Sequence, residues 1–184
     1  MLTRHTARLL TGLLIGPLIW MLVSAILWPG RASARTIYTS VGNPATATLS
    51  NPSGVFATSD GSIYIADTGS HRIRKVSPAG TITTVAGTGA AGFSGDSGLA
   101  VNAQLQSPTG IFVLTDSTIY IADRDNHRVR RVDPTGTITT VAGNGIAGYS
   151  GEGTATTAQL RSPTGVFVDA SNRLYIADRD NHRI

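Results

Sequence analysis

Three histidines and three aspartates recur in step along this sequence, and they are the side chains best suited to chemistry. Each histidine follows an aspartate by four residues, as in Asp67 and His71. Because histidine and aspartate act as general bases and metal ligands, a hydrolase, a lyase or a metal site would use them. A catalytic site, however, usually breaks the symmetry of a repeat, whereas these side chains occur once in each repeating unit.

Residues that are present once per repeat serve the repeat itself. We therefore predict turn or packing roles for the histidines, and we expect the aspartates to accept backbone N–H bonds in the turn. We predict no catalytic residue, no metal ligand and no cofactor, and the pattern identifies no ligand-binding residue. The residues assigned to this structural set are Asp67, His71, Arg72, Asp123, His127, Arg128, Asp178, His182 and Arg183.

Two glycine-rich segments, 87–92 and 143–148, fit the G-x-G-x-x-G pattern of phosphate-binding loops. That pattern binds phosphate only between a strand and a helix, and no helical periodicity follows either segment. Residues 123–126 resemble the start of a calcium loop but lack its spaced oxygen ligands and its glycine. We expect flexible connections between repeats and no bound nucleotide or calcium.

Basic side chains recur beside the aspartates and raise the question of nucleic-acid binding. The chain has 15 basic and 11 acidic residues, but three arginines lie before residue 35, which leaves 12 against 11 in the remainder. A nearly neutral domain offers no electrostatic footprint for phosphate backbones. We expect ion pairs with neighbouring aspartates, or contact with anionic surface polymers, for Arg72, Arg74, Lys75, Arg128, Arg130 and Arg131.

An internal repeat determines the fold prediction. Segments of the form Pro-x-Gly-x-Phe begin at Pro52, Pro108 and Pro163, spaced by 56 and then 55 residues. The first unit predicts four short strands, and the Pro and Gly of 77–80 favour a hairpin turn between the last two. Strand 62–66 is apolar on both faces, which favours stacked propeller blades over a sandwich. The expected strands of the first unit are 54–57, 62–66, 71–76 and 81–86.

The segments 64–76 and 122–129, with their Asp-x-x-Asn-His-Arg-like signature, resemble the NHL repeat. The resemblance extends over about residues 36–184. It implies an all-β fold, a β-propeller of four-stranded antiparallel blades, and such rings usually have six blades. About two and a half blades are expected here.

The N-terminus has the features of a secretory signal peptide: Arg4 and Arg8, an apolar run over 9–28, and Ala-Ser-Ala at 32–34. An uncleaved helix over 9–28 would instead anchor the chain in a membrane. Either alternative places the propeller outside the cytoplasm, as a secreted, periplasmic or cell-surface protein. With no cysteine in the chain, disulfides cannot contribute to its stability.

The expected organisation follows from these patterns. Thr36–Asn43 matches the last strand of a blade, so we expect it to close the ring by pairing with the last blade. We also expect the present sequence to be a fragment of a longer propeller. Such a fragment should associate in isolation, because neighbouring blades cover one another's apolar faces. The domains are 1–34, a signal peptide or anchor with an apolar leader helix; 35–49, the closing strand and a linker; 50–105 and 106–160, two blades; and 161–184, part of a third.

The predicted function is a binding or scaffold module outside the cytoplasm. Its partner would be a protein, a glycan or a small molecule held on one face of the propeller. We do not expect it to bind nucleic acid, and we expect contact with a membrane only through residues 9–28, if they are not cleaved. One alternative is an enzyme resembling the lyase and lactonase propellers, with its site in further blades. Another is the ectodomain of a membrane-anchored sensor.

Overall fold

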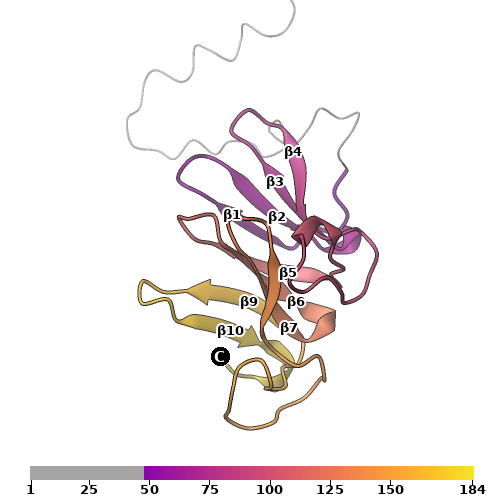
Figure 1. Ribbon diagram of the computed structural model, residues 1–184, viewed down its shortest axis with the longest axis vertical. Coiled ribbons are helices and arrows are strands. Elements are labelled where there is room, and N and C mark those ends of the chain that lie inside the picture. The colour runs from indigo at the N-terminus through magenta and orange to yellow at the C-terminus, as the bar shows by residue number, and fades with distance from the viewer. Residues whose placement is uncertain (1–47) are drawn as a thin grey trace, which may run out of the picture. The chain divides into compact units, whose positions relative to one another are not determined.

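The computed structural model describes residues 48–184 (Figure 1). The expected leader helix, its cleavage site and the closing strand at Thr36–Gly42 lie outside these residues. Within the described part of the chain, no helix is long and apolar enough to cross a membrane.

The fold is all-β. It contains two antiparallel sheets of four strands each and a third sheet of two strands. Each complete sheet follows the chain order, so that consecutive strands are neighbours. We call the three sheets blades 1, 2 and 3. Blade 1 contains β1 (Gly54–Ala57), β2 (Ile63–Asp67), β3 (Arg72–Val76) and β4 (Ile82–Ala86); blade 2 contains β5 (Pro108–Val113), β6 (Ile119–Asp123), β7 (Arg128–Val132) and β8 (Ile138–Ala142); blade 3 contains β9 (Pro163–Val168) and β10 (Leu174–Asp178).

The only helices of residues 48–184 are single 3₁₀ turns, three of which occupy the same place in each blade. They follow the second strand and precede a histidine. The predicted strands of blade 1 agree with the observed ones to within one residue at each end. The four turns are η1 (Thr68–Ser70), η2 (Ala100–Asn102), η3 (Arg124–Asn126) and η4 (Arg179–Asn181).

The strand register is the same in blades 1 and 2. Ile65 pairs with Arg74 in blade 1, as Ile121 pairs with Arg130 in blade 2. The third and fourth strands are joined by a tight turn, in which the N–H of Gly80 donates to the carbonyl of Ser77 at 2.8 Å. Gly80 has a φ of 84°, a conformation that glycine adopts without steric cost.

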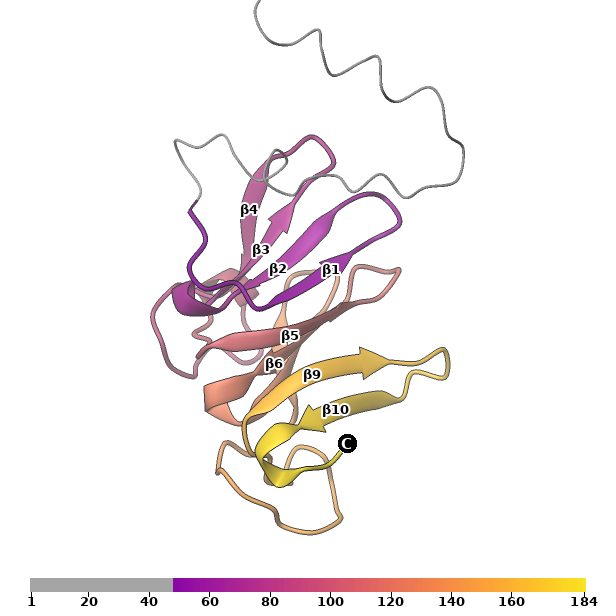
Figure 2. The same cartoon turned by 180° about the vertical axis from the view of Figure 1, so that it is seen from behind.

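The first strands of the three blades, β1, β5 and β9, lie side by side (Figure 2). Gly54 and Gly110 allow this approach, because a Cβ on Gly110 would lie 2.6 Å from the carbonyl oxygen of Thr164 in the next blade. One phenylalanine per blade continues the contact: the ring centroids of Phe56 and Phe112 are 5.1 Å apart, as are those of Phe112 and Phe167. Edge-to-face aromatic pairs of this kind stabilise the packing beyond the area they bury.

The main core lies between blades 1 and 2. It contains Tyr64 and Ile73 from blade 1 and Ile111, Ile121 and Ile138 from blade 2. Ile65, on the opposite face of β2 from Tyr64, is also buried. Strand β2 is therefore buried on both faces, as expected for a strand inside a stack of sheets.

Candidate functional site

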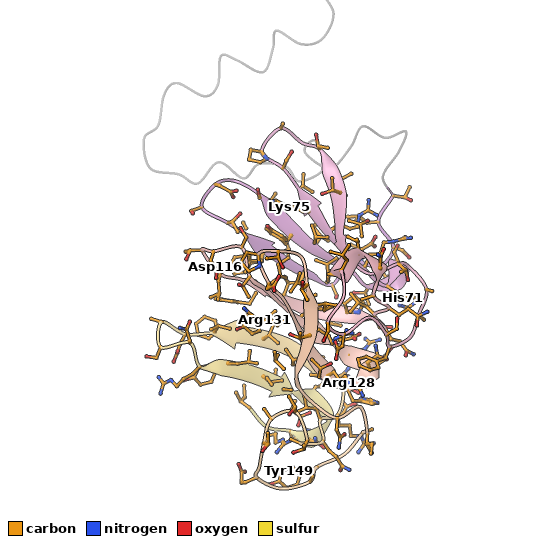
Figure 3. All side chains as sticks on the ribbon, viewed as in Figure 1. His71, Lys75, Asp116, Arg128, Arg131 and Tyr149 are labelled. Atoms are coloured by element: carbon orange, nitrogen blue, oxygen red, sulfur yellow. The ribbon has the colours of Figure 1, made fainter. Side chains whose placement is uncertain are left out.

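The recurring aspartates and histidines flank the 3₁₀ turn between the second and third strands. His71, His127 and His182 each end this turn in the left-handed conformation with the same φ of 54°. The shared backbone geometry indicates a shared structural role, which the hydrogen-bond partners of each imidazole define. Figure 3 shows His71 on one side of the sheets and Asp116, from the loop after the first strand of blade 2, on the opposite side.

The histidines connect successive blades. Nδ1 of His71 accepts the backbone N–H of Ser107 at 3.0 Å, and Nδ1 of His127 accepts that of Ser162 at 3.2 Å. Ser107 and Ser162 directly precede the first strand of the next blade. Because the acceptor belongs to one blade and the donor to the next, each bond joins two blades.

The aspartates connect segments within one blade. Oδ1 of Asp67 accepts the N–H of Ser50 at 2.6 Å, and Oδ1 of Asp123 accepts that of Gln106 at 2.7 Å. Asp178 repeats the contact with the N–H of Arg161 at 2.6 Å. The sequence pattern placed the donors in the turn itself. The structure places them 17 residues earlier, in the segment that leads into the first strand.

In blade 2 the second oxygen of Asp123 anchors a buried charge cluster. It accepts a hydrogen bond from Nδ2 of Asn126 at 2.7 Å and lies 3.5 Å from the guanidinium of Arg130. Burial disfavours the carboxylate and raises the pKa of Asp123 to about 6, although these donors and the N–H of Gln106 act in the opposite direction. Asp123 and Arg130 have no exposed surface.

Arg130 holds the long connection between blades 1 and 2. Its guanidinium forms an ion pair with Asp96 at 2.6 Å and donates to the carbonyls of Ser94 and Gln104 at 3.2 and 3.4 Å. The expected ion pairs with aspartates are thus present for this residue. Arg130 thus connects the segment before blade 2 to the buried carboxylate of Asp123.

Within residues 48–184, blade 1 shows only part of this cluster. Ser70 stands where blade 2 has Asn126, and Arg74 stands where blade 2 has Arg130. Within residues 48–184, neither Oδ2 of Asp67 nor Nε of Arg74 has a hydrogen-bond partner, although both atoms are buried. The repeats therefore share a backbone frame and differ in their charge contacts.

The glycine-rich segments are part of the same frame. The N–H groups of Gly87, Thr88 and Gly92 donate to carbonyls of Ala100, Ala103 and Leu105, at the far end of the same connection. The carbonyl of Thr88 in turn accepts from Arg72 at 2.6 Å, and Arg128 makes the equivalent bond to Asn144 at 2.7 Å. These N–H groups already donate to backbone carbonyls, and no α-helix follows either segment within residues 48–184. The segments therefore do not form a phosphate-binding loop.

The connection between blades 1 and 2 is therefore held by hydrogen bonds at both of its ends. Besides these hydrogen bonds, the ring of Phe93 lies 3.7 Å from the guanidinium carbon of Arg128. A cation over an aromatic face at this distance is attractive. In blade 3 the guanidinium carbon of Arg183 lies 4.3 Å from the ring centroid of Tyr149.

A cleft opens on the opposite side of the sheets, between blades 1 and 2. It has a volume of about 300 Å³ and lies between the loops that follow β1 and β5. Its apolar lining residues are the partly exposed Phe56 and Leu114 and the buried Tyr64 and Val113. The polar lining residues are Thr58, Ser59, Asp60, Thr115 and Ser117.

Asp60 gives this cleft a fixed negative charge. Its carboxylate accepts hydrogen bonds from the hydroxyl of Thr58 and from the N–H of Ser62, which lower its pKa to about 2. Sequence reasoning missed this cleft because hydroxyl-rich loops also occur as ordinary turns. The only signal was that Asp60 and Asp116 recur in loops that, apart from Leu114, are otherwise made of Ser, Thr and Gly.

No group of three or more His, Asp or Glu side chains in residues 48–184 is arranged to hold a metal ion. The repeat histidines lie apart from one another because each belongs to a different blade. What the described site residues form is a set of contacts within and between blades, beside a separate polar cleft.

Comparisons with known proteins agree with this repeat frame. The NHL repeat model matches residues 49–76 and 160–184, and the model of the teneurin NHL domain matches residues 89–148. NHL repeat-containing protein 2 of Bos taurus is 31% identical over 153 residues, which cover 77% of this chain and 21% of that protein. The chain therefore spans about a fifth of this relative.

Solved structures with the same arrangement of sheets include an auxiliary nutrient binding protein from Bacteroides ovatus. It is 29% identical, with a TM-score of 0.61, and the match covers 73% of this chain and 36% of that one. A protein of the same description from Bacteroides thetaiotaomicron is 26% identical, with a TM-score of 0.59 and 71% and 35% coverage. With its in-phase repeats, its four-stranded antiparallel blades and these matches, the chain belongs to the NHL-repeat family and has a β-propeller-like fold.

Proposed function

We propose that this chain is an extracytoplasmic binding module that holds a small polar ligand in the cleft between blades 1 and 2. The observation that carries the proposal is the contrast between the two sides of the sheets. On the turn side, the recurring Asp, His and Arg side chains are largely occupied by contacts within and between blades. The other side offers a cleft with hydroxyl groups around aromatic and aliphatic surface.

The composition of the cleft suits a neutral, hydroxylated molecule such as a sugar. Threonine and serine hydroxyls both donate and accept hydrogen bonds, while the partly exposed Phe56 offers apolar surface to the less polar face of a sugar ring. Asp60 adds an ionised acceptor. The nutrient-binding description of two similar structures supports a binding role.

The proposal can be tested by recording ¹⁵N spectra of the chain during titration with a panel of neutral mono- and disaccharides. We expect amide shifts confined to residues 56–64 and 113–117. Thr115→Arg, which fills the cleft, should abolish them, and Thr154→Arg, on an exposed connection away from the cleft, should not. Shifts elsewhere, or none with any sugar, would reject this site.

The location outside the cytoplasm rests on the apolar run over 9–28 and on Ala-Ser-Ala at 32–34. We expect cleavage after Ala34, which intact-mass analysis of exported protein would detect as a chain beginning at Arg35. Recovery of the uncut chain in the membrane fraction would instead favour the sensor ectodomain. Recovery of the whole chain in the cytoplasm would contradict both.

A further inference from the structure

Asp60 is the charged residue among those of residues 48–184 that line the cleft between blades 1 and 2. The other lining residues carry hydroxyl groups or are apolar. Asp116 holds the equivalent place in the loop of blade 2, between the lining residues Thr115 and Ser117, but is not itself part of the lining. Because Asp60 is exposed, its carboxylate is open to a bound molecule.

Hydrogen bonds within the loop hold the Asp60 carboxylate in place. Its Oδ1 accepts the hydroxyl of Thr58 and the N–H of Ser62, the latter at 2.9 Å, and Oδ2 accepts the hydroxyl of Ser62 at 3.0 Å. A carboxylate accepts about four hydrogen bonds, so Oδ2 keeps capacity for another. The hydroxyl protons of Thr58 and Ser62 are directed at Asp60, so these three side chains form a corner that accepts hydrogen bonds and does not donate them.

The carboxylate in this corner is ionised at neutral pH. The hydrogen bonds within the loop, with a smaller contribution from the charge of Lys75 on β3, lower the pKa of Asp60 to about 2. The Lys75 ammonium itself lies over the ring of Tyr64, 5.3 Å from its centroid. Asp116 on the neighbouring loop also has a lowered pKa, chiefly through a backbone hydrogen bond and to a smaller extent through the charge of Arg131.

The pair of Thr58 and Asp60 departs from the repeat. Leu114 stands at the Thr58 position in blade 2, and Asp169 and Ser171 stand at the two positions in blade 3. A side chain that is copied with each blade serves the blade. This pair occurs in blade 1 alone among the blades of residues 48–184, and it lies where a cleft opens, which favours a role in binding.

We infer that Asp60 is the specificity-determining residue of the cleft, where it selects a sugar that presents a hydroxyl or ammonium donor and rejects a sugar acid. The inference rests on the proposed binding of a sugar in this cleft and adds the chemical class of that sugar. A hydroxyl or ammonium group donates to Oδ2, whereas the carboxylate of a sugar acid has no proton to donate and is repelled. Thr58 is a positioning residue, because it acts through Asp60.

The methyl glycosides of glucosamine, glucose and glucuronic acid test this assignment, because they share one ring and differ in charge. Each is titrated into the ¹⁵N-labelled full chain at pH 6 and low salt, and its affinity is measured from the amide shifts of residues 56–64 and 113–117. We expect the glucosamine glycoside to bind most tightly and the glucuronate least, in steps of about two- to fivefold, as for an exposed ion pair. Added salt should narrow these steps.

Asp60→Asn should bring the three affinities together, because the amide is uncharged and can donate. Asp133→Asn is the matched control and should keep their order. Asp133 likewise accepts a threonine hydroxyl, that of Thr135 at 2.6 Å, but it lies in the turn between β7 and β8. Equal affinities in the wild-type chain, or an order that survives Asp60→Asn, would overturn the inference and leave sugar binding in place. Shifts with none of the three glycosides would reject the proposed function, and this inference with it.

Two variants of Thr58 test its positioning role. Thr58→Val removes the hydroxyl at nearly constant volume, and Thr58→Ser keeps it. We expect Thr58→Val to weaken binding of the glucosamine and glucose glycosides by about threefold or more, and Thr58→Ser to bind them as the wild-type chain does. Equal losses in the two variants would show that the hydroxyl does not position Asp60. Circular dichroism checks that every variant is folded.

Discussion

The imidazole of His71 and the backbone of Ser107 form a hydrogen bond between two blades, with 3.0 Å between Nδ1 and N. We expect His71→Ala to lower the free energy of unfolding by about 1–2 kcal/mol, because the Ser107 N–H loses its acceptor. Urea denaturation at low protein concentration measures this change.

His182→Ala is the control for this change. It removes a histidine from the same turn conformation, but one whose Nδ1 accepts no N–H from residues 48–184. Its cost should be smaller. Equal losses for the two variants would mean that the turn conformation, and not the bond between blades, is what the histidine provides.

Gly110 allows blades 2 and 3 to approach. In Gly110→Ala the new Cβ would lie 2.6 Å from the backbone oxygen of Thr164, which cannot move without shifting blade 3. We expect a loss of about 2–3 kcal/mol. Gly165→Ala, whose Cβ would meet the Cβ of Ala177 at 3.4 Å, should be tolerated. Thermal unfolding compares the two; similar melting temperatures would contradict the close approach.

Arg130 neutralises Asp123 and binds the connection before blade 2. Arg130→Met should cost about 3–5 kcal/mol, because it leaves a buried carboxylate without its cation. It should also open residues 87–106 to limited proteolysis. Arg131→Met is the control, since Arg131 has no ion pair within residues 48–184. A resistant connection in Arg130→Met would show that its backbone hydrogen bonds suffice.

The raised pKa of Asp123 predicts a pH dependence of stability. Its carboxyl binds a proton up to about pH 6 in the folded chain but only to about pH 4 when unfolded. The folded state therefore holds more protons between these values, and its free energy of unfolding falls as the pH rises from 4 to 6, by roughly 2–3 kcal/mol.

Urea titrations at several pH values measure this slope, which Asp123→Asn should remove. Asp133→Asn should leave it in place, because hydrogen bonding from Thr135 lowers the pKa of Asp133. Stability contributed by Asp133 is present above its unfolded pKa and disappears as the pH falls through its folded value. An unchanged slope in Asp123→Asn would assign the titration to another group.

Much of the fold could be predicted from residue order. The short apolar run of β2, the Pro and Gly of the 77–80 turn and the spacing from Pro52 to Pro108 are signals within the chain order, and they located the strands of blade 1 to within one residue. The repetition of His71 and His127 likewise indicated a role shared by all repeats, because a residue copied with the blade experiences the same neighbours in each copy.

The partners of these residues could not be predicted from the sequence. Asp67 accepts from Ser50 and His71 from Ser107, atoms that lie 17 and 36 residues away along the chain. Arg74 and Arg130 look equivalent in the sequence, yet within residues 48–184 only Arg130 forms an ion pair with a loop carboxylate. Local chain geometry determines strands and turns, whereas hydrogen-bond partners, burial and pKa depend on which distant segments packing brings within a few ångströms, and this was decided only by the tertiary structure.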